Sequence, residues 1–160
     1  MSAFTLFHVV LSLVGIGLGC VVAFGLLLGK RLPIWTATFL STTVLTSVTG
    51  FMFPVHHFMP SHGVGIVSLI VLALAIYALY VKRLAGVWRR VYVIDAVIAL
   101  YLNFFVLIVQ LFQKLPALKA LAPTQTEAPF KVAQLTALVA FALLAIFATC
   151  RFRNDQLRTA

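Results

Sequence analysis

The sequence predicts an all-α protein, a polytopic transmembrane helix bundle with five spans, its N-terminus outside and its C-terminus in the cytoplasm. Composition gives the class: 63% of the 160 residues are hydrophobic and only 9% are charged, whereas soluble proteins average about 45–50% apolar and about 25% charged residues. A water-soluble fold of this length has no interior large enough for so much apolar surface. We therefore expect one transmembrane domain, residues 1–160, with the lipid bilayer as its solvent.

Five apolar runs give the number of spans. About 20 residues, at 1.5 Å per residue, cross about 30 Å of hydrocarbon as a helix. The five runs cover residues 4–29, 34–53, 62–81, 88–113 and 130–150. Before the last run, Thr124-x-x-Glu127 resembles a capping box, in which a threonine and a glutamate satisfy the first amides of a helix.

The basic residues give these runs a direction. Nine of the 12 Lys and Arg residues follow the first, third and fifth runs, and three lie on the opposite side. The nine are Lys30, Arg31, Lys82, Arg83, Arg89, Arg90, Arg151, Arg153 and Arg158, and the three are Lys114, Lys119 and Lys131. The positive-inside rule therefore predicts an external N-terminus. Because the basic residues lie between the spans, we expect headgroup contacts and no nucleic-acid partner.

The longest connection, residues 114–129, lies on the outer side in this topology. Its first part, KLPALKALAP, spaces three leucines three residues apart with lysines between them. The pattern fits a short helix lying at the membrane interface, and an irregular loop is the alternative.

Polar side chains of the fourth run share one face. Projected at 100° per residue, Tyr92, Asp95, Asn103, Gln110 and Gln113 fall within an arc of about 80°. A polar group turned toward hydrocarbon costs several kcal/mol. This stripe is therefore expected to face protein or water.

The first two runs carry similar stripes of small and polar residues. They comprise Thr5, His8, Ser12, Gly15 and Gly19 in the first run, and Thr38, Thr42, Thr46 and Thr49 in the second, with Thr43, Ser47 and Gly50 beside them. Such residues are typical of close helix packing in membranes, where hydroxyls also bond to carbonyls of their own helix. The stripes therefore fit either packing or a polar interior.

Asp95 is the intramembrane acid of the sequence. It lies about 10 Å inside the cytoplasmic end of the fourth span, at 1.5 Å per residue. An ionisable residue at that depth marks a functional site by default. The alternative is a protonated carboxyl bonded to a Thr or Ser of the second span, or one paired with Arg89 or Arg90.

All four histidines lie toward the predicted outer side. His56, His57 and His62, with Met52 and Met59 nearby, form a candidate metal site for copper. Two histidines on facing helices are also suited to haem, and a histidine with glutamines to a quinone. The alternative is that these histidines are solvated and bind no cofactor.

Signatures of hydrolytic or phosphoryl-transfer enzymes are absent from the sequence. It has no glycine-rich phosphate loop after a strand, no closely spaced pair of cysteines, and no two carboxylates at one depth. The protein is therefore expected to be something other than an enzyme of these classes.

Two segments carry a family resemblance: TTVLTSVTGFMFP at residues 42–54 and YLNFFVLIVQLFQKLPALKALAPTQTEAPF at residues 101–130. They resemble small polytopic inner-membrane proteins of bacteria that have no known activity. The resemblance implies location in a bacterial inner membrane and transfers no functional residues.

Three functions are compatible with these features. In the leading hypothesis, a polar interior that opens outward binds a small molecule such as haem or a quinone. Its candidate ligand-binding residues are His8, His62, Asn103, Gln110 and Gln134. In the second, the protein is a non-catalytic accessory or assembly subunit whose 114–129 loop meets a membrane-protein partner or a second copy. In the third, Asp95 couples transport to protons or ions.

Overall fold

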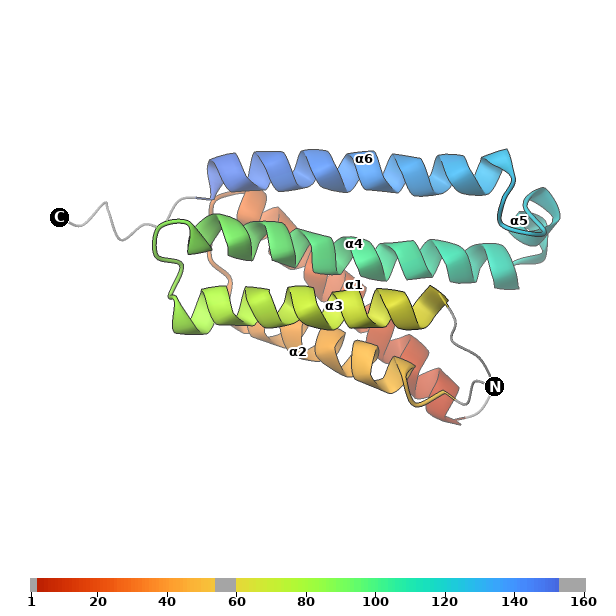
Figure 1. Ribbon diagram of the computed structural model, residues 1–160, viewed down its shortest axis with the longest axis horizontal. Coiled ribbons are helices and arrows are strands. Elements are labelled where there is room, and N and C mark those ends of the chain that lie inside the picture. The colour runs from red at the N-terminus through yellow and green to blue at the C-terminus, as the bar shows by residue number, and fades with distance from the viewer. Residues whose placement is uncertain (1–2, 54–59, 153–160) are drawn as a thin grey trace.

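The computed structural model describes residues 3–53 and 60–152, and this part of the chain is all-helical, as predicted. Five long helices run alternately in opposite directions and form one bundle (Figure 1). The elements are α1 (Ala3–Leu27), α2 (Pro33–Gly50), α3 (Pro60–Ile76) continued by a π-helical turn η1 (Tyr77–Val81), α4 (Trp88–Lys114), the short α5 (Pro116–Leu121) and α6 (Ala128–Arg151). The long helices begin and end within three residues of the five apolar runs.

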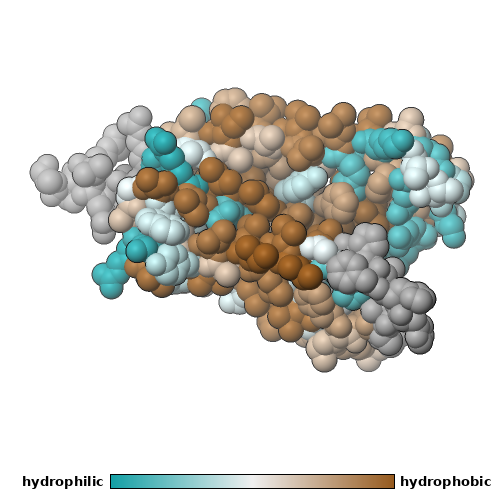
Figure 2. Space-filling model, viewed as in Figure 1, coloured by the Kyte–Doolittle hydropathy of each residue, from teal (hydrophilic) through white to brown (hydrophobic). Residues whose placement is uncertain are grey.

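Four segments are long and apolar enough to cross a membrane: α1, His62–Val81, α4 and α6. The segment predicted as the second span, α2, is not among them. It is only 18 residues long, and eight of these are Thr or Ser, which lowers its hydropathy. Figure 2 shows hydrophobic side chains covering the middle of the molecule and hydrophilic ones gathered toward both ends.

α4 occupies the centre of the bundle, where it contacts α1, α3 and α6. It also approaches α2 at two polar pairs: the hydroxyls of Tyr92 and Thr36 are 3.4 Å apart, and Asn103 Nδ2 lies 3.4 Å from Thr43 Oγ1. The polar stripe of α4 therefore faces the hydroxyl-rich α2.

The two ends of the bundle differ in charge. We call the end that carries His8, His62 and Lys114 the histidine end, and the end that carries Arg31 and Arg89 the arginine end. Toward the histidine end, α1 and α2 slant away from α6 (Figure 1).

The hydrophobic core lies in the half of the bundle nearer the arginine end. Its buried members are Val22, Ala23, Leu26, Phe39, Leu40, Leu72, Ala75, Ala78, Leu84, Tyr92, Val93, Ala96, Ala99, Leu100, Ala148 and Phe152. Small residues allow this close packing. A Cβ on Gly19 would lie only 2.4 Å from Leu100 Cδ1 and 2.7 Å from Phe39 Cε2. The predicted role of Gly19 in close helix approach is therefore confirmed.

The connection between α3 and α4 is held by its own side chains. Arg83 and Leu84 have positive φ angles of 49° and 62°, a conformation that is costly for residues other than glycine unless the surroundings impose it. Leu84 is only 1% exposed and belongs to the core. The Lys82 ammonium lies 5.5 Å from the Tyr77 ring centroid and 5.6 Å from that of Trp88, within cation–π range.

The connection between α4 and α6 contains a helix, α5, at the predicted leucine-rich segment. The predicted capping box is wrong in one respect, because α6 begins after Glu127 and Thr124 is not its N-cap. The Glu127 carboxylate accepts hydrogen bonds from the Thr124 amide (3.1 Å), the Thr124 hydroxyl (2.9 Å) and the Thr126 amide (3.0 Å). Desolvation acts to raise the pKa of Glu127, but these hydrogen bonds outweigh it and lower the pKa.

Candidate functional site

A cavity of about 530 Å³ lies among α1, α2, α3 and α4 in the half of the bundle nearer the histidine end. It is partly open, and most of its wall is apolar. Small residues on α2 and α3, among them Ser47, Gly50, Gly65 and Ser68, line one part of it. The space exists because α1 and α2 slant away here while their facing side chains are short.

His8 enters this cavity from α1 in a defined orientation. Its Nδ1 atom lies 2.8 Å from Thr49 Oγ1. The Thr49 hydroxyl donates its single proton to the Leu45 carbonyl oxygen, 2.7 Å away, so it accepts a hydrogen bond from His8. This arrangement favours the neutral tautomer with the proton on Nδ1 and a lone pair on Nε2. The Phe53 ring packs edge-on against the imidazole, with centroids 5.0 Å apart.

His62 lines the same cavity from α3, with its ring centroid 5.7 Å from that of Phe51. Two histidines 54 positions apart in the sequence therefore line the same cavity. His56 and His57, the other candidate metal ligands, lie outside the described residues. Within the described residues, no three His, Cys, Asp or Glu side chains are grouped so that they could hold a metal ion.

Asn103 and Gln110 line the cavity from α4. Asn103 is half-buried, with its side-chain nitrogen 3.4 Å from Thr43 Oγ1, whereas Gln110 is exposed. Thr46 Oγ1 also lines the wall; it is buried and has no hydrogen-bond partner among the described residues. The cavity therefore combines an apolar wall with a few groups able to donate or accept hydrogen bonds.

Gln134, by contrast, does not line the cavity, so its predicted place beside His8 is wrong. Its amide donates to the Phe105 carbonyl oxygen at 3.2 Å, because α6 packs directly on α4. Its Oε1 atom is buried with no partner in the described part of the chain. Gln113, also in the predicted stripe, bonds to a different part of the chain: its Nε2 donates to Gln125 Oε1 at 3.5 Å.

Sequence reasoning missed two residues of this site, Lys114 and Thr49. Lys114 lines the cavity at the last residue of α4, although its charge suggested only a topology signal. Its spacing of four residues from Gln110 and eleven from Asn103 places all three on one helix face, a signal that was present. Thr49 was assigned to a packing stripe, and no sequence pattern pairs it with His8.

Asp95 lies in the other half of the molecule. It is 8% exposed, and its Oδ2 atom is buried with no hydrogen-bond partner among the described residues. The expected partners, a Thr or Ser of α2 or the side chains of Arg89 and Arg90, do not bond to that atom. Arg89 instead donates to the Phe152 carbonyl oxygen. The stripe on α4 is thus divided, with Tyr92 and Asp95 in the close-packed half and Asn103 and Gln110 at the cavity.

Comparisons of the chain with protein-family models, with curated proteins and with solved structures find no match. The functional argument therefore rests on the chain's own residues.

Proposed function

We propose that this protein is a five-span protein of a bacterial inner membrane that binds a small amphipathic molecule, of the quinone or haem class, in the cavity at its histidine end. Three arguments support the proposal: one on topology, one on orientation and one on the cavity itself.

The topology argument concerns α2. Both α1 and α3 run from the histidine end to the arginine end (Figure 1). If both cross the bilayer, the chain between them must return across it, and α2 is the segment that returns. Its 18 residues extend about 27 Å as a helix. Its hydroxyls bond to carbonyls one turn back, as Thr38 does to Ile34 and Thr42 to Thr38, which makes a Thr-rich helix compatible with lipid.

The orientation argument uses the basic residues. The arginine end carries the basic loops after α1 and η1, and the histidine end carries Lys114, Lys119 and Lys131. Under the positive-inside rule, the arginine end faces the cytoplasm. The cavity would then open toward the outer side of the membrane.

One observation carries the binding function: a single, mostly apolar cavity collects His8, His62, Asn103 and Gln110 from three different helices. Pockets for small molecules are typically apolar, with a few placed polar groups, and measure about 300–1,000 Å³. The volume of about 530 Å³ lies in that range. His8, His62 and the two α4 amides are far apart in sequence, so the fold itself brings the three helices' polar groups together.

The chemistry of the polar groups selects the ligand class. His8 Nε2 offers a lone pair, and Thr49 fixes the ring through Nδ1, as the partners of ligating histidines do. With that atom, His8 would ligate a haem iron together with His62 from another helix, or would accept a hydrogen bond from a quinol hydroxyl. The amides of Asn103 and Gln110 and the Lys114 ammonium would donate to carbonyl or carboxylate oxygens.

The test compares the wild type with matched variants purified from native membranes. We expect an absorption band that is lost in both His8→Ala and His62→Ala if the ligand is haem. If the ligand is a quinone, we expect extractable quinone that is lost in His8→Ala and Gln110→Leu. Gln134→Leu is the control, because Gln134 lies in the same half but outside the cavity wall. A wild-type preparation that is colourless and free of quinone and metal would refute the redox function.

Asp95 supports a second candidate, proton- or ion-coupled transport. A buried carboxyl with an unpartnered oxygen inside a membrane helix is costly and is retained mainly where it acts. We expect Asp95→Asn to preserve the folded protein and to abolish proton uptake in proteoliposomes. Uptake equal to that of the wild type would assign Asp95 a structural role.

A further inference from the structure

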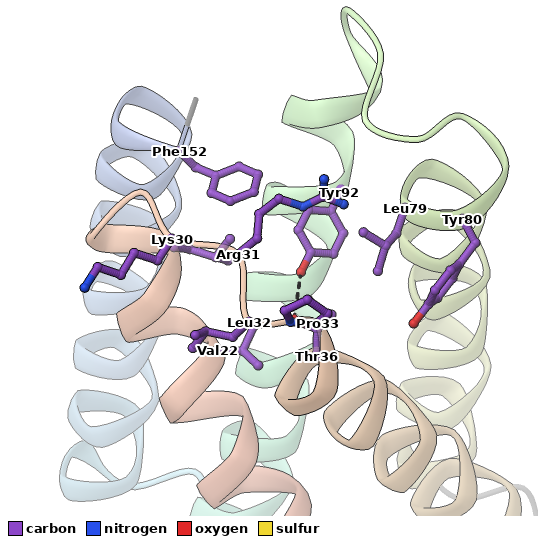
Figure 3. Close-up of a pocket in the computed structure, with 11 residues that line it drawn as sticks. Val22, Lys30, Arg31, Leu32, Pro33, Thr36, Leu79, Tyr80, Tyr92 and Phe152 are labelled. Atoms are coloured by element: carbon purple, nitrogen blue, oxygen red, sulfur yellow. Dashed lines mark hydrogen bonds between the residues drawn. The ribbon is translucent and has the colours of Figure 1, made fainter. Parts of the chain in front are cut away.

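A second, smaller cavity lies at the arginine end, at the opposite end of the bundle from the cavity that His8 and His62 line. It measures about 100 Å³. Its lining comes from several elements: the end of α1, the α1–α2 turn, the start of α2, η1, the start of α4 and Phe152 (Figure 3). It is therefore built where most of the chain converges, and it is independent of the function proposed above.

The charge in this cavity comes from one side chain. Arg31 extends into it beside the Tyr92 ring, whereas the neighbouring Lys30 directs its ammonium away from it (Figure 3). Among the described residues that line it, none is acidic. The cavity thus presents a guanidinium, which forms two parallel hydrogen bonds with phosphate or carboxylate oxygens.

Two buried hydroxyls point into the same space. Tyr92 is 2% exposed and Thr36 is 5% exposed, and their oxygen atoms are 3.4 Å apart (Figure 3). Hydrogen bonds between hydroxyls usually measure about 2.5–3.0 Å. The pair is therefore only weakly bonded, and these hydroxyls are able to donate to a further oxygen acceptor in the cavity.

The backbone at this cavity is also unusual. The α3 helix widens here into the π-helical turn Tyr77–Val81, closed by the Lys82 amide on the Tyr77 carbonyl oxygen at 3.0 Å. This turn provides two lining residues, Leu79 and Tyr80. Single π-helical turns within α-helices are rare and occur frequently at functional sites.

We infer that this cavity binds the phosphate group of an anionic phospholipid, held by Arg31, Tyr92 and Thr36. The volume suits a group of a few heavy atoms and excludes a whole lipid. The surface beside it is apolar and exposed: Ile34 is 80% exposed, Trp35 48% and Tyr80 55%. Acyl chains would lie along that surface while the headgroup phosphate enters the cavity. Basic pockets between membrane helices recognise lipid headgroups in this way. A free phosphate ion has the same binding chemistry, so the test must separate the two sources.

The experiment uses the full chain in detergent and native mass spectrometry to count bound phosphatidylglycerol at increasing lipid concentration. We expect Arg31→Gln to weaken binding about tenfold, because it removes a charge-assisted bidentate contact. Lys30→Gln is the matched control: it removes the same charge one residue away, where the ammonium points elsewhere, and we expect a change below about twofold. We expect the Thr36→Val and Tyr92→Phe variants, which keep the shape of the cavity, to weaken binding about threefold each.

Further arms of the experiment distinguish the outcomes. Phosphatidylcholine tests whether net negative charge is needed, and inorganic phosphate tests for a free ion. If inorganic phosphate displaces the lipid at millimolar concentration, the source is a free phosphate and the site stands. Equal losses in Arg31→Gln and Lys30→Gln would show only general attraction of lipid to a basic surface and would overturn the inference. Circular dichroism of each variant separates loss of binding from loss of fold.

Discussion

The two halves of this bundle are built from the same long helices, but one half has a closely packed interior and the other contains a cavity. The half near the arginine end is closed by Leu72, Ala75, Ala99 and other residues that are fully buried. In the other half, no residue of α4 from 101 to 109 is buried, and a cavity of about 530 Å³ remains. The same helix α4 passes through both environments.

The difference shows that small residues permit close helix packing in one half, whereas small and polar residues line a cavity in the other. In the closed half, small side chains bring backbones together, as Gly19 does against Phe39 and Leu100. In the open half, short side chains such as Ser12 and Thr46 line the cavity. The four predictions below test this contrast, beginning with the largest expected effect.

Leu72→Ala tests whether the closed half determines stability. Leu72 is 0% exposed, so its truncation leaves a void, and we expect a loss of about 2–3 kcal/mol in unfolding free energy. The lower part of the usual range applies because lipid tails, like the core, are apolar. Leu107→Ala is the control, because Leu107 already borders the cavity and should cost below about 1 kcal/mol. Denaturation in mixed micelles measures both, and equal losses would contradict the contrast between the halves.

Gly19→Ala tests close packing directly. The added methyl would overlap Leu100 and Phe39, so we expect a loss of about 2 kcal/mol in unfolding free energy. Gly17→Ala is the matched control on the same helix, since a Cβ there has nothing within 4 Å. That variant should be neutral or slightly stabilising, because alanine favours helix over glycine. A stable Gly19→Ala protein would mean that α1 can shift without cost.

Thr49→Val tests the orientation of His8 in the open half. Without the hydroxyl, His8 Nδ1 loses its acceptor, and we expect ligand affinity to fall about tenfold. Thr38→Val is the control, because that hydroxyl bonds only to its own helix. Nitrogen-15 chemical shifts of His8 report the tautomer even without ligand: the wild type should show a protonated Nδ1. A mixture of tautomers in the wild type would contradict the assignment.

Glu127→Gln tests the loop ahead of α6, where we expect the smallest effect. The pKa of Glu127 is lower in the folded protein than in the unfolded chain, so its contribution to stability is present above the unfolded pKa of about 4.3. It is lost as pH falls through the lower folded pKa. Hydrogen exchange at the start of α6 should therefore increase in wild type below about pH 4, after correction for intrinsic rates. The glutamine variant should lack that increase, and an identical pH dependence in both proteins would exclude the effect.

Much of the fold could be predicted because the relevant signals are local. The apolar runs placed every long helix end within three residues, since length and hydropathy are properties of consecutive residues. α2 was harder, because its hydroxyls lower its hydropathy while bonding to its own carbonyls. The π-helical turn in α3 had no signal that we recognised.

The candidate site was predicted in part. Periodicity grouped Asn103 with Gln110 on α4, and it also included Gln113, which bonds to Gln125. The predicted ligand set also included Gln134 of α6, which bonds to the Phe105 carbonyl oxygen instead. A helix projection gives the direction of a side chain about its own axis. It does not give the neighbour that stands there, which depends on how far each helix tilts.

The sequence by itself determined that this chain is a bundle of apolar helices with basic residues concentrated at one end, because hydropathy and charge can be counted residue by residue. Only the tertiary structure decided that α1 and α2 slant away from α6, that His8 contacts Thr49, and that Asp95 and Asn103 lie in different environments. These features depend on contacts between residues about 40 or more positions apart. Such contacts follow from helix tilt and from the shapes of opposing side chains, which no local pattern encodes.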